Sequence, residues 1–149
     1  MLDISLIYQI EQTKSMYNIM DDSVRIKIPV SVKKQAKYAY KLKDLGFLGG
    51  TATGWKRAKQ LSEDPSISIE DLRAMKSRFA RHVYASYPSY EAWIDAGKPL
   101  DEGKWHRTNG IIACMIWSST AGFHWVNSDA NIRLLNKHYA NKNYTKTEL

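Results

Sequence analysis

The segment from Gly110 to Val126, GIIACMIWSSTAGFHWV, constrains the fold more than any other part of the sequence. When successive residues are placed about 100° apart, its large apolar side chains fall on every side of a helix. A helix that is apolar all round is buried inside a protein, and this segment is shorter than the ~20 residues that span a bilayer. We therefore expect a buried central helix over about 110–126, around which the other segments pack.

Length and composition fit a single, mainly α domain. A chain of 149 residues can bury a sizeable core, and its five Trp and nine Tyr supply large apolar surfaces. The only cysteine, Cys114, lies inside the apolar segment, so we expect a buried thiol and neither a disulfide within the chain nor a nucleophile. Because no signal peptide or run long enough to span a membrane is visible, we expect a soluble protein without a membrane partner.

Hydrophobic periodicity divides the chain into three parts. Residues 1–22 are expected to form an amphipathic N-terminal helix, residues 23–139 a helical domain, and residues 140–149 a polar, frayed tail. Alternation from Val24 to Ile28 predicts a short strand. Besides the central helix, the domain is expected to contain helices over residues 32–45, 55–61, from Ser68 to about 85, 90–96 and 130–139. Ser31, Ser68, Ser89 and Ser128 stand at the starts of four of them as caps, and Gly97 ends the helix over 90–96.

Four glycines between residues 46 and 54 indicate a backbone that turns sharply or approaches another group closely. A basic helix follows, and its free N–H groups and dipole favour an anion, so this loop could cradle a phosphate. It is not a Walker A loop, because Trp55 and Lys56 stand where that motif has Lys and Ser or Thr. The alternative is a tight corner between two helices with a threonine cap.

The basic residues are concentrated in one third of the chain. The net charge is +7, and residues 23–60 contain ten Lys or Arg against Asp44 alone. This concentration is typical of a protein that binds a polyanion, although a solvated lysine-rich face that maintains solubility has the same composition. Arg57 has a second interpretation, as a member of a buried ion pair. The candidate nucleic-acid contacts are Lys33, Lys34, Lys37, Lys41, Thr51, Lys56, Arg57, Lys59 and Arg81.

Motifs for catalysis are absent from the sequence. It contains no HExxH, no CxxC pair and no P-loop, and its four histidines lack metal-ligand spacing. The sequence therefore predicts no catalytic residue, no metal site and no cofactor. The best enzymatic alternative places His82 and His106 around a phosphodiester as general acid and base, with Arg57, Arg73 or Arg81 nearby. A structural role is the alternative for His82.

A spaced pattern covering about two thirds of the chain resembles a small uncharacterised domain found in tailed phages and large double-stranded DNA viruses. The pattern departs from that domain at Cys114 and at residues 118–120. The resemblance implies a viral source, an association with genome or head functions, and a location in the host cytoplasm or the virion. The residues that carry it are Gly49, Gly50, Thr51, Gly54, Arg57, Ala58, Leu61, Ser68, Glu70, Arg73, Met75, Phe79, Ala80, Arg81, His82, Gly110, Ile112, Ala113, Trp117, Gly122 and Trp125.

These observations lead to one principal hypothesis and two alternatives. The principal hypothesis is a small basic viral protein that binds nucleic acid, DNA rather than RNA, without enzymatic activity. The binding surface in this hypothesis is the lysine- and arginine-rich face formed by residues 25–59. The first alternative is a virion structural or protein-interaction module whose basic face meets an acidic viral head or host protein. The second is the phosphodiester-processing enzyme that uses His82 and His106.

Overall fold

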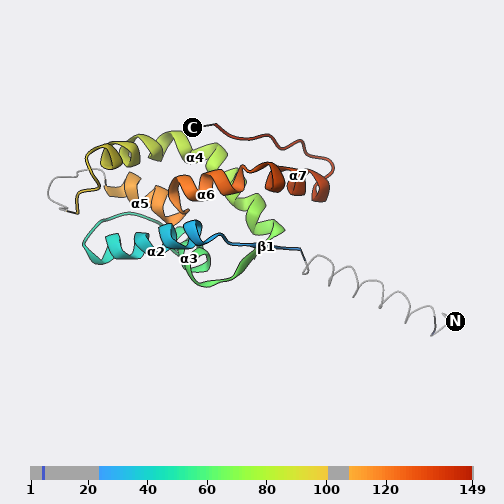
Figure 1. Cartoon of the computed structure of the whole chain (residues 1–149), viewed down its shortest axis with the longest axis horizontal. Helices are drawn as coiled ribbons and strands as arrows, with labels where there is room; N and C mark the ends of the chain where they lie inside the picture. The colour runs from blue at the N-terminus through green and yellow to red at the C-terminus, as the bar shows by residue number, and fades with distance from the viewer. Residues whose placement is uncertain (1–4, 6–23, 101–107, 149) are drawn as a thin grey trace.

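The structure, a computed structural model, describes residue 5, residues 24–100 and residues 108–148, with the backbone alone at Val83 and Tyr84. Apart from residue 5, the N-terminal helix expected over residues 1–22 therefore lies outside the described residues. The described part is mainly α, as the sequence indicates, with one short antiparallel strand pair (Figure 1). Its elements are β1 (Arg25–Lys27), α2 (Val30–Asp44), α3 (Ala52–Glu63), β2 (Ser66–Ser68), α4 (Ile69–Asp95), α5 (Thr108–Ile116), α6 (Ser119–Val126) and α7 (Asp129–His138).

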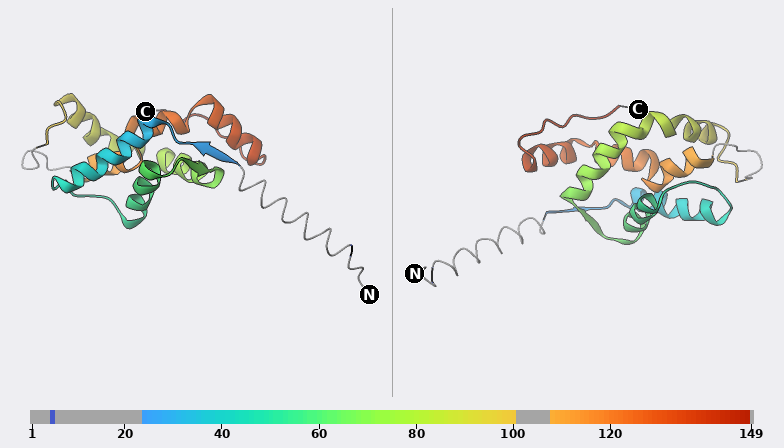
Figure 2. Two further views of the ribbon diagram at one scale, coloured as in Figure 1. Left: turned by 60° about the horizontal axis from the view of Figure 1, so that its bottom comes forward. Right: turned by 180° about the vertical axis from the view of Figure 1, so that it is seen from behind.

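Helices α5 and α6 form the middle layer, with α4 on one side and α2 and α3 on the other (Figures 1 and 2). Ile111, Ile112 and Met115 of α5 are at most 1% exposed. The segment 110–126 is therefore buried and central, as its apolar residues on every side predict. None of the described helices is long and apolar enough to cross a membrane.

The expected single helix over 110–126 is divided at Trp117 and Ser118 into two helices. Ser118 and Ser119 have φ angles of 67° and 49°, in the left-handed region that ends a helix. The Ser118 hydroxyl donates to the Val32 carbonyl of α2 at 2.8 Å, which ties the break to the neighbouring layer. Gly122 fits the close turn, since a Cβ there would lie 2.1 Å from the Trp117 carbonyl oxygen. The expectation of one continuous helix is wrong for this reason.

Helix α4 continues through Pro88, where the sequence suggested a break and a second helix over 90–96. Proline removes one helical hydrogen bond, but the residues beyond it are held by packing. Trp93 is 1% exposed and its indole N–H donates to the Pro99 carbonyl at 2.8 Å. Gly110 of α5 also packs closely, because a Cβ there would lie 2.7 Å from the Ser89 Cβ. Tertiary contact thus maintains a helix that local sequence would end.

The strand expected at 24–28 is confirmed as β1, which pairs antiparallel with β2 in the register Arg25 opposite Ser68 and Lys27 opposite Ser66. Two of the expected serine caps are also confirmed. Ser68 and Ser128 cap α4 and α7, with hydroxyls that accept the N–H groups of Asp71 and Asn131. Ser31 does not cap α2, which begins at Val30 after Pro29.

The C-terminal tail is bound to the domain, and the expectation that it frays is wrong for residues 140–148. The side-chain amide of Asn136 pairs with the backbone of Tyr144 at 2.6 and 3.0 Å. Further along, the Thr147 N–H donates to Asn127 at 2.8 Å. In Figures 1 and 2 this tail runs back from α7 across the molecule.

Candidate anion-binding cleft

The glycine-rich loop between α2 and α3 is fixed against α5. The Thr108 hydroxyl exchanges hydrogen bonds with the Leu48 backbone at 3.1 and 3.2 Å, and the Trp55 indole N–H donates to the Gly49 carbonyl at 3.2 Å. Gly50 has a φ of 84°, and a Cβ there would lie 2.4 Å from the Trp55 indole nitrogen. Only glycine fits this position without displacing its neighbours.

Thr51 follows the glycines and caps α3, its hydroxyl accepting the Gly54 N–H at 3.0 Å. The corner with a threonine cap is thus present, and α3 begins three residues before the expected Trp55. The first amides of a helix have no acceptor within it, so the first turn of α3 supplies N–H groups and the positive end of its dipole. These groups belong to the wall of a cleft.

That cleft lies between α3, α4 and α5 and has a volume of about 650 Å³, within the range of small-ligand sites, roughly 300–1,000 Å³. Helix α4 contributes residues at positions 74, 78 and 81, and α5 contributes 109, 113 and 116, spacings that place each set on one face of its helix. The described lining includes three arginines and no carboxylate. It comprises Gly49, Gly50, Thr51, Thr53, Gly54, Arg57, Ala74, Arg78, Arg81, Asn109, Ala113, Ile116 and Trp117.

Arg57 enters the cleft with its charge largely compensated. Its guanidinium lies 2.9 Å from the Asp71 carboxylate and donates to the side-chain oxygen Oε1 of Gln60 at 2.5 Å, and the Gln60 side-chain Nε2 donates to Asp71 at 2.7 Å. Burial alone would raise the pKa of Asp71, but hydrogen bonds from Arg57, Gln60 and Ser68 and the charge of Arg57 outweigh it, so the pKa lies below the ordinary value. The ion pair considered for Arg57 from the sequence is present.

Arg78 and Arg81 have no carboxylate partner among the residues that the structure describes. Arg78 lies over the Trp117 ring with its guanidinium carbon 5.5 Å from the ring centre, the same distance as Arg57. Burial and the neighbouring charge of Arg81 lower the pKa of Arg78, while Cys114 acts in the opposite direction. The described walls of the cleft therefore carry excess positive charge.

The structure separates the candidate residues that the sequence grouped together. Thr51, Arg57 and Arg81 line the cleft. Lys37 and Lys59 share a different, shallow groove between α2 and α3. Among the remaining candidates, Lys33 donates to the backbone carbonyl of Asp64, and Lys34 lines a third hollow with Lys98. The Lys41 ammonium lies 5.4 Å from the centre of the Tyr38 ring, and Lys56 is exposed on α3.

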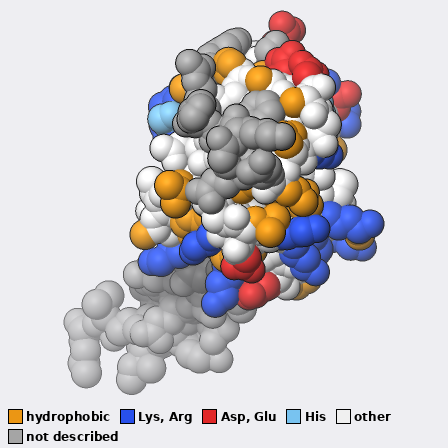
Figure 3. Space-filling model, turned by 90° about the vertical axis from the view of Figure 1, so that its left-hand side faces the viewer, with side chains coloured by type: hydrophobic (Ala, Val, Ile, Leu, Met, Phe, Trp, Pro, Cys, Tyr) orange, Lys and Arg blue, Asp and Glu red, His pale blue; other side chains and the backbone are white. Residues whose placement is uncertain are grey.

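This separation follows from the helix that joins the two surfaces. On α3, Lys59 lies about 200° around the axis from Arg57, so the two cannot face the same groove. Figure 3 shows Lys and Arg side chains gathered across the lower part of one side of the molecule. The structure therefore brings Lys37 of α2 and Lys59 of α3 to one groove, whereas Arg57 lines the cleft.

Three polar residues of the cleft were not among the sequence candidates, namely Thr53, Arg78 and Asn109. A signal for Arg78 was available, because it precedes Arg81 by three residues and shares its helix face. Asn109 and Thr53 had no such signal, since only the docking of the glycine loop onto α5 brings them to the cleft.

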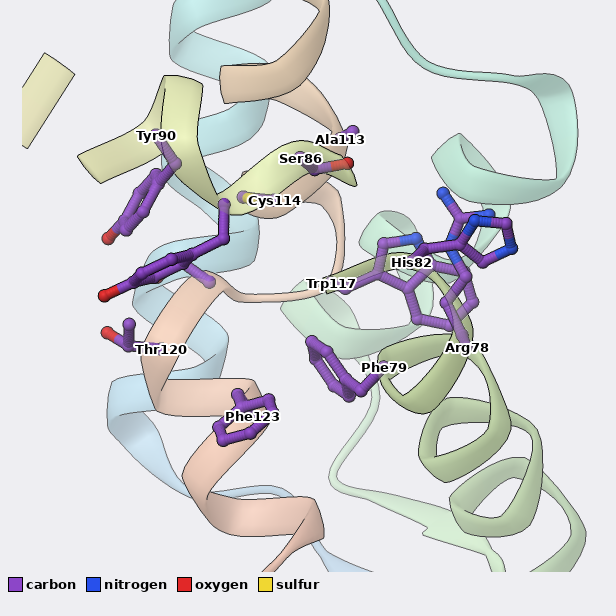
Figure 4. A pocket seen from close by; sticks show the side chains of 12 residues that line it. Arg78, Phe79, His82, Ser86, Tyr90, Ala113, Cys114, Trp117, Thr120 and Phe123 are labelled. Atoms are coloured by element: carbon purple, nitrogen blue, oxygen red, sulfur yellow. The ribbon is translucent and has the colours of Figure 1, made fainter. Parts of the chain in front are cut away.

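Beside the cleft lies a small, mostly apolar cavity of about 30 Å³, room for roughly one water molecule. Figure 4 shows Arg78 and His82 from α4 beside the Trp117 ring, with Cys114 deeper in the cavity. Burial and the charges of Arg78 and Arg81 lower the pKa of His82. Cys114 is half-buried, whereas the sequence predicted a buried thiol. Burial raises the pKa of this thiol to about 12, so it is protonated at neutral pH.

His106, the second histidine of the enzymatic alternative, lies outside the described residues. His82 is the only histidine in the described lining of either cavity. Within the described residues, no three His, Cys, Asp or Glu side chains are placed to hold a metal ion. The groups that the cleft offers are hydrogen-bond donors and positive charge.

Comparison of the chain with known protein families, curated proteins and solved structures finds no match.

Proposed function

We propose that this protein binds nucleic acid without enzymatic activity, and that the cleft between α3, α4 and α5 holds a phosphate of the strand. One observation carries the proposal: Arg78 and Arg81 face a cleft whose described lining includes a third arginine, the start of α3 and no carboxylate. Guanidinium groups match the geometry of phosphate oxygens. Backbone N–H groups at a helix start add donors for the same oxygens.

Binding of this kind is insensitive to base sequence. Contacts to phosphate position a protein on nucleic acid but carry no sequence information. Trp117, the aromatic residue of the cleft, is 9% exposed and has two guanidiniums over its ring, which leaves little surface for stacking a base. Lys37 and Lys59, in their separate groove, add long-range attraction for the polyanion.

The viral source and setting belong to the same proposal. DNA is the proposed partner, and the host cytoplasm or the virion the proposed location. Several residues that carry the resemblance to the viral domain also line the cleft, which supports a shared role for the site. They are Gly49, Gly50, Thr51, Gly54, Arg57, Arg81, Ala113 and Trp117.

Exposed apolar residues favour the protein-interaction alternative as a second candidate. Leu45 precedes the glycine corner and Leu48 lies within it, and they are 44% and 67% exposed. An acidic peptide that covers these side chains would place its carboxylates near the basic surfaces of α2 and α3. Such a partner would be a viral head protein or a host protein.

A fluorescence anisotropy titration distinguishes the two candidates. Labelled duplex DNA, single-stranded DNA and RNA are titrated with protein at several salt concentrations. A plot of the logarithm of the binding constant against the logarithm of the salt concentration should have a negative slope. Its magnitude should be about 0.9 for each duplex phosphate contacted. Arg81→Gln should weaken binding to every sequence and reduce that slope by about one.

The matched control is Arg133→Gln, which removes the same charge from an exposed position on α7 outside the cleft. This variant should bind like the parent protein. Lys37→Gln with Lys59→Gln should cause a smaller loss that vanishes as salt rises. Absence of binding to all three nucleic acids at ~50 mM salt, where phosphate contacts are strong, would refute the proposal and favour the protein partner.

A further inference from the structure

We infer that the cleft is selective for a dianionic phosphate monoester, the terminal phosphate of a nucleic-acid strand, over the monoanionic diester inside the strand. This inference rests on the proposed function and deepens it, because it specifies which phosphate the cleft takes. It follows from the charges, the donor groups and the apolar part of the cleft.

The charge of the cleft matches two negative charges better than one. Arg57 is compensated by Asp71 at 2.9 Å, whereas Arg78 and Arg81 lack a carboxylate partner among the described residues. The two unpaired guanidiniums repel each other, which is one reason that the pKa of Arg78 is lowered. A diester carries one charge and would leave this repulsion partly in place. A monoester carries close to two charges at neutral pH and relieves it.

The donor groups surround the cleft on three sides. Arg78 and Arg81 project from α4, Asn109 lies at the start of α5, and Thr51 and Thr53 lie at the start of α3. A terminal phosphate presents three oxygens to such an arrangement, whereas an internal phosphate presents two and continues into sugar on both sides. Donors on several walls therefore suit the end of a strand.

The remaining lining of the cleft is apolar and offers nothing to read a base. Ala113 and Ile116 of α5 and Ala74 of α4 have no polar side-chain atoms, and Trp117 is 9% exposed. These four side chains therefore favour no particular base, and the polar groups of the cleft are those assigned above to the phosphate. The charged and titratable groups at the site are Arg57 from α3 with Asp71 behind it, Arg78, Arg81 and His82 from α4, and Cys114 from α5.

The test compares single-stranded oligonucleotides of one sequence that differ at the end: 5′-hydroxyl, 5′-phosphate, 3′-phosphate and 5′-methylphosphate. The methylphosphate has nearly the size of the phosphate but one charge fewer. At pH 7.5 and moderate salt, we expect the 5′- or 3′-phosphate oligonucleotide to bind about tenfold more tightly than the 5′-hydroxyl and 5′-methylphosphate ones. This preference should shrink below pH ~6, where the second proton returns to the phosphate.

Arg81→Gln should abolish the preference, and Arg133→Gln should leave it intact. A second readout is the NMR titration of His82, which lies beside Arg78 but outside the described lining of the cleft. Neutralising Arg78 and Arg81 removes two causes of the low pKa of His82, so the phosphorylated strand should raise that pKa.

The binding results for the oligonucleotides separate the inference about strand ends from the proposed function. Equal binding of all four oligonucleotides would overturn the inference and leave the proposed function in place. Absence of binding to any of them at low salt would overturn the inference, and it would overturn the proposed function as well if duplex DNA and RNA also failed to bind. If inorganic phosphate or a nucleoside monophosphate bound as tightly as the phosphorylated strand, the ligand would be a free phosphate compound, and the assignment to strand ends would be wrong.

Discussion

Replacement of Asp71 by asparagine should lower stability and strengthen anion binding at the same time. Asp71 accepts hydrogen bonds from Arg57 and Gln60 at 2.9 and 2.7 Å. Hydrogen bonds to charged groups contribute about 1.5–3 kcal/mol each, and asparagine keeps the shape and one acceptor while losing the charge. The side chains of Arg57 and Asp71 are 15% and 29% exposed, so solvent screens the pair partly. We therefore expect the free energy of unfolding to fall by about 1–2 kcal/mol.

The effect on binding has the opposite sign, because the neutral amide of the Asp71→Asn variant would no longer compensate the charge of Arg57. Two unit charges 4 Å apart in water interact by about 1 kcal/mol, which corresponds to roughly fivefold in affinity. The variant should bind a phosphorylated strand about fivefold more tightly. For a single strand, the slope of log binding constant against log salt concentration should be steeper by about 0.7. Urea denaturation and anisotropy titrations of the same preparations measure the two effects.

The stability difference also depends on pH. The pKa of Asp71 is lowered in the folded protein from its ordinary value of 3.8, so its stabilisation is complete above that value and is lost as the pH falls through the folded pKa. The difference in the free energy of unfolding between the parent protein and the variant should therefore be constant from pH 7 to about 5. It should disappear below pH ~4. Asp95→Asn, an exposed position at the other end of α4, is the control. A destabilised variant with unchanged anion affinity would refute the view that Asp71 compensates Arg57 in the cleft.

Three further predictions concern single side chains. Trp117→Ala should lower the free energy of unfolding by ~3–5 kcal/mol, the range for a buried large aromatic, and an unchanged melting temperature would mean that this position is not central. Thr51→Ala should cost ~1 kcal/mol through loss of the α3 cap, whereas Thr51→Ser, which keeps the hydroxyl, should cost much less; equal losses would contradict the capping role. Cys114, whose pKa of about 12 compares with an ordinary 9.0, should react with iodoacetamide at pH 8 about 10³-fold more slowly in the folded protein than in guanidinium. Equal rates would show that the thiol is not buried.

Local sequence determined some elements, and tertiary contact determined others. The apolar segment indicated its own burial, and Ser68 and Ser128 indicated two helix starts, because those properties depend on residues a few positions apart. The break at Ser118 depends on the Val32 carbonyl, 86 residues away. The passage of α4 through Pro88 depends on the packing of Trp93. Neither could be predicted from residues nearby in the sequence.

In the cleft, too, some features follow from local sequence and others from tertiary contact. The glycine-rich loop was recognised as either a tight corner or an anion cradle, and in the structure the threonine-capped corner forms one wall of the cleft. The cleft itself requires α3, α4 and α5 to meet, and no pattern in the sequence encodes that meeting. Counting charges along residues 23–60 grouped Lys59 with Arg57, whereas helical geometry sends them to different surfaces.

The bound tail has a consequence for how the chain acquires its structure during synthesis. Lys76 in the first third of α4 is 5% exposed, burial lowers the pKa of its ammonium, and that ammonium donates to the Thr147 hydroxyl at 2.6 Å. Its partner is made 71 residues later. Until then the ammonium must be satisfied by water, because a buried ammonium without a partner is costly. We therefore expect the Lys76 ammonium to stay hydrated until residue 147 has been made and has docked on α4.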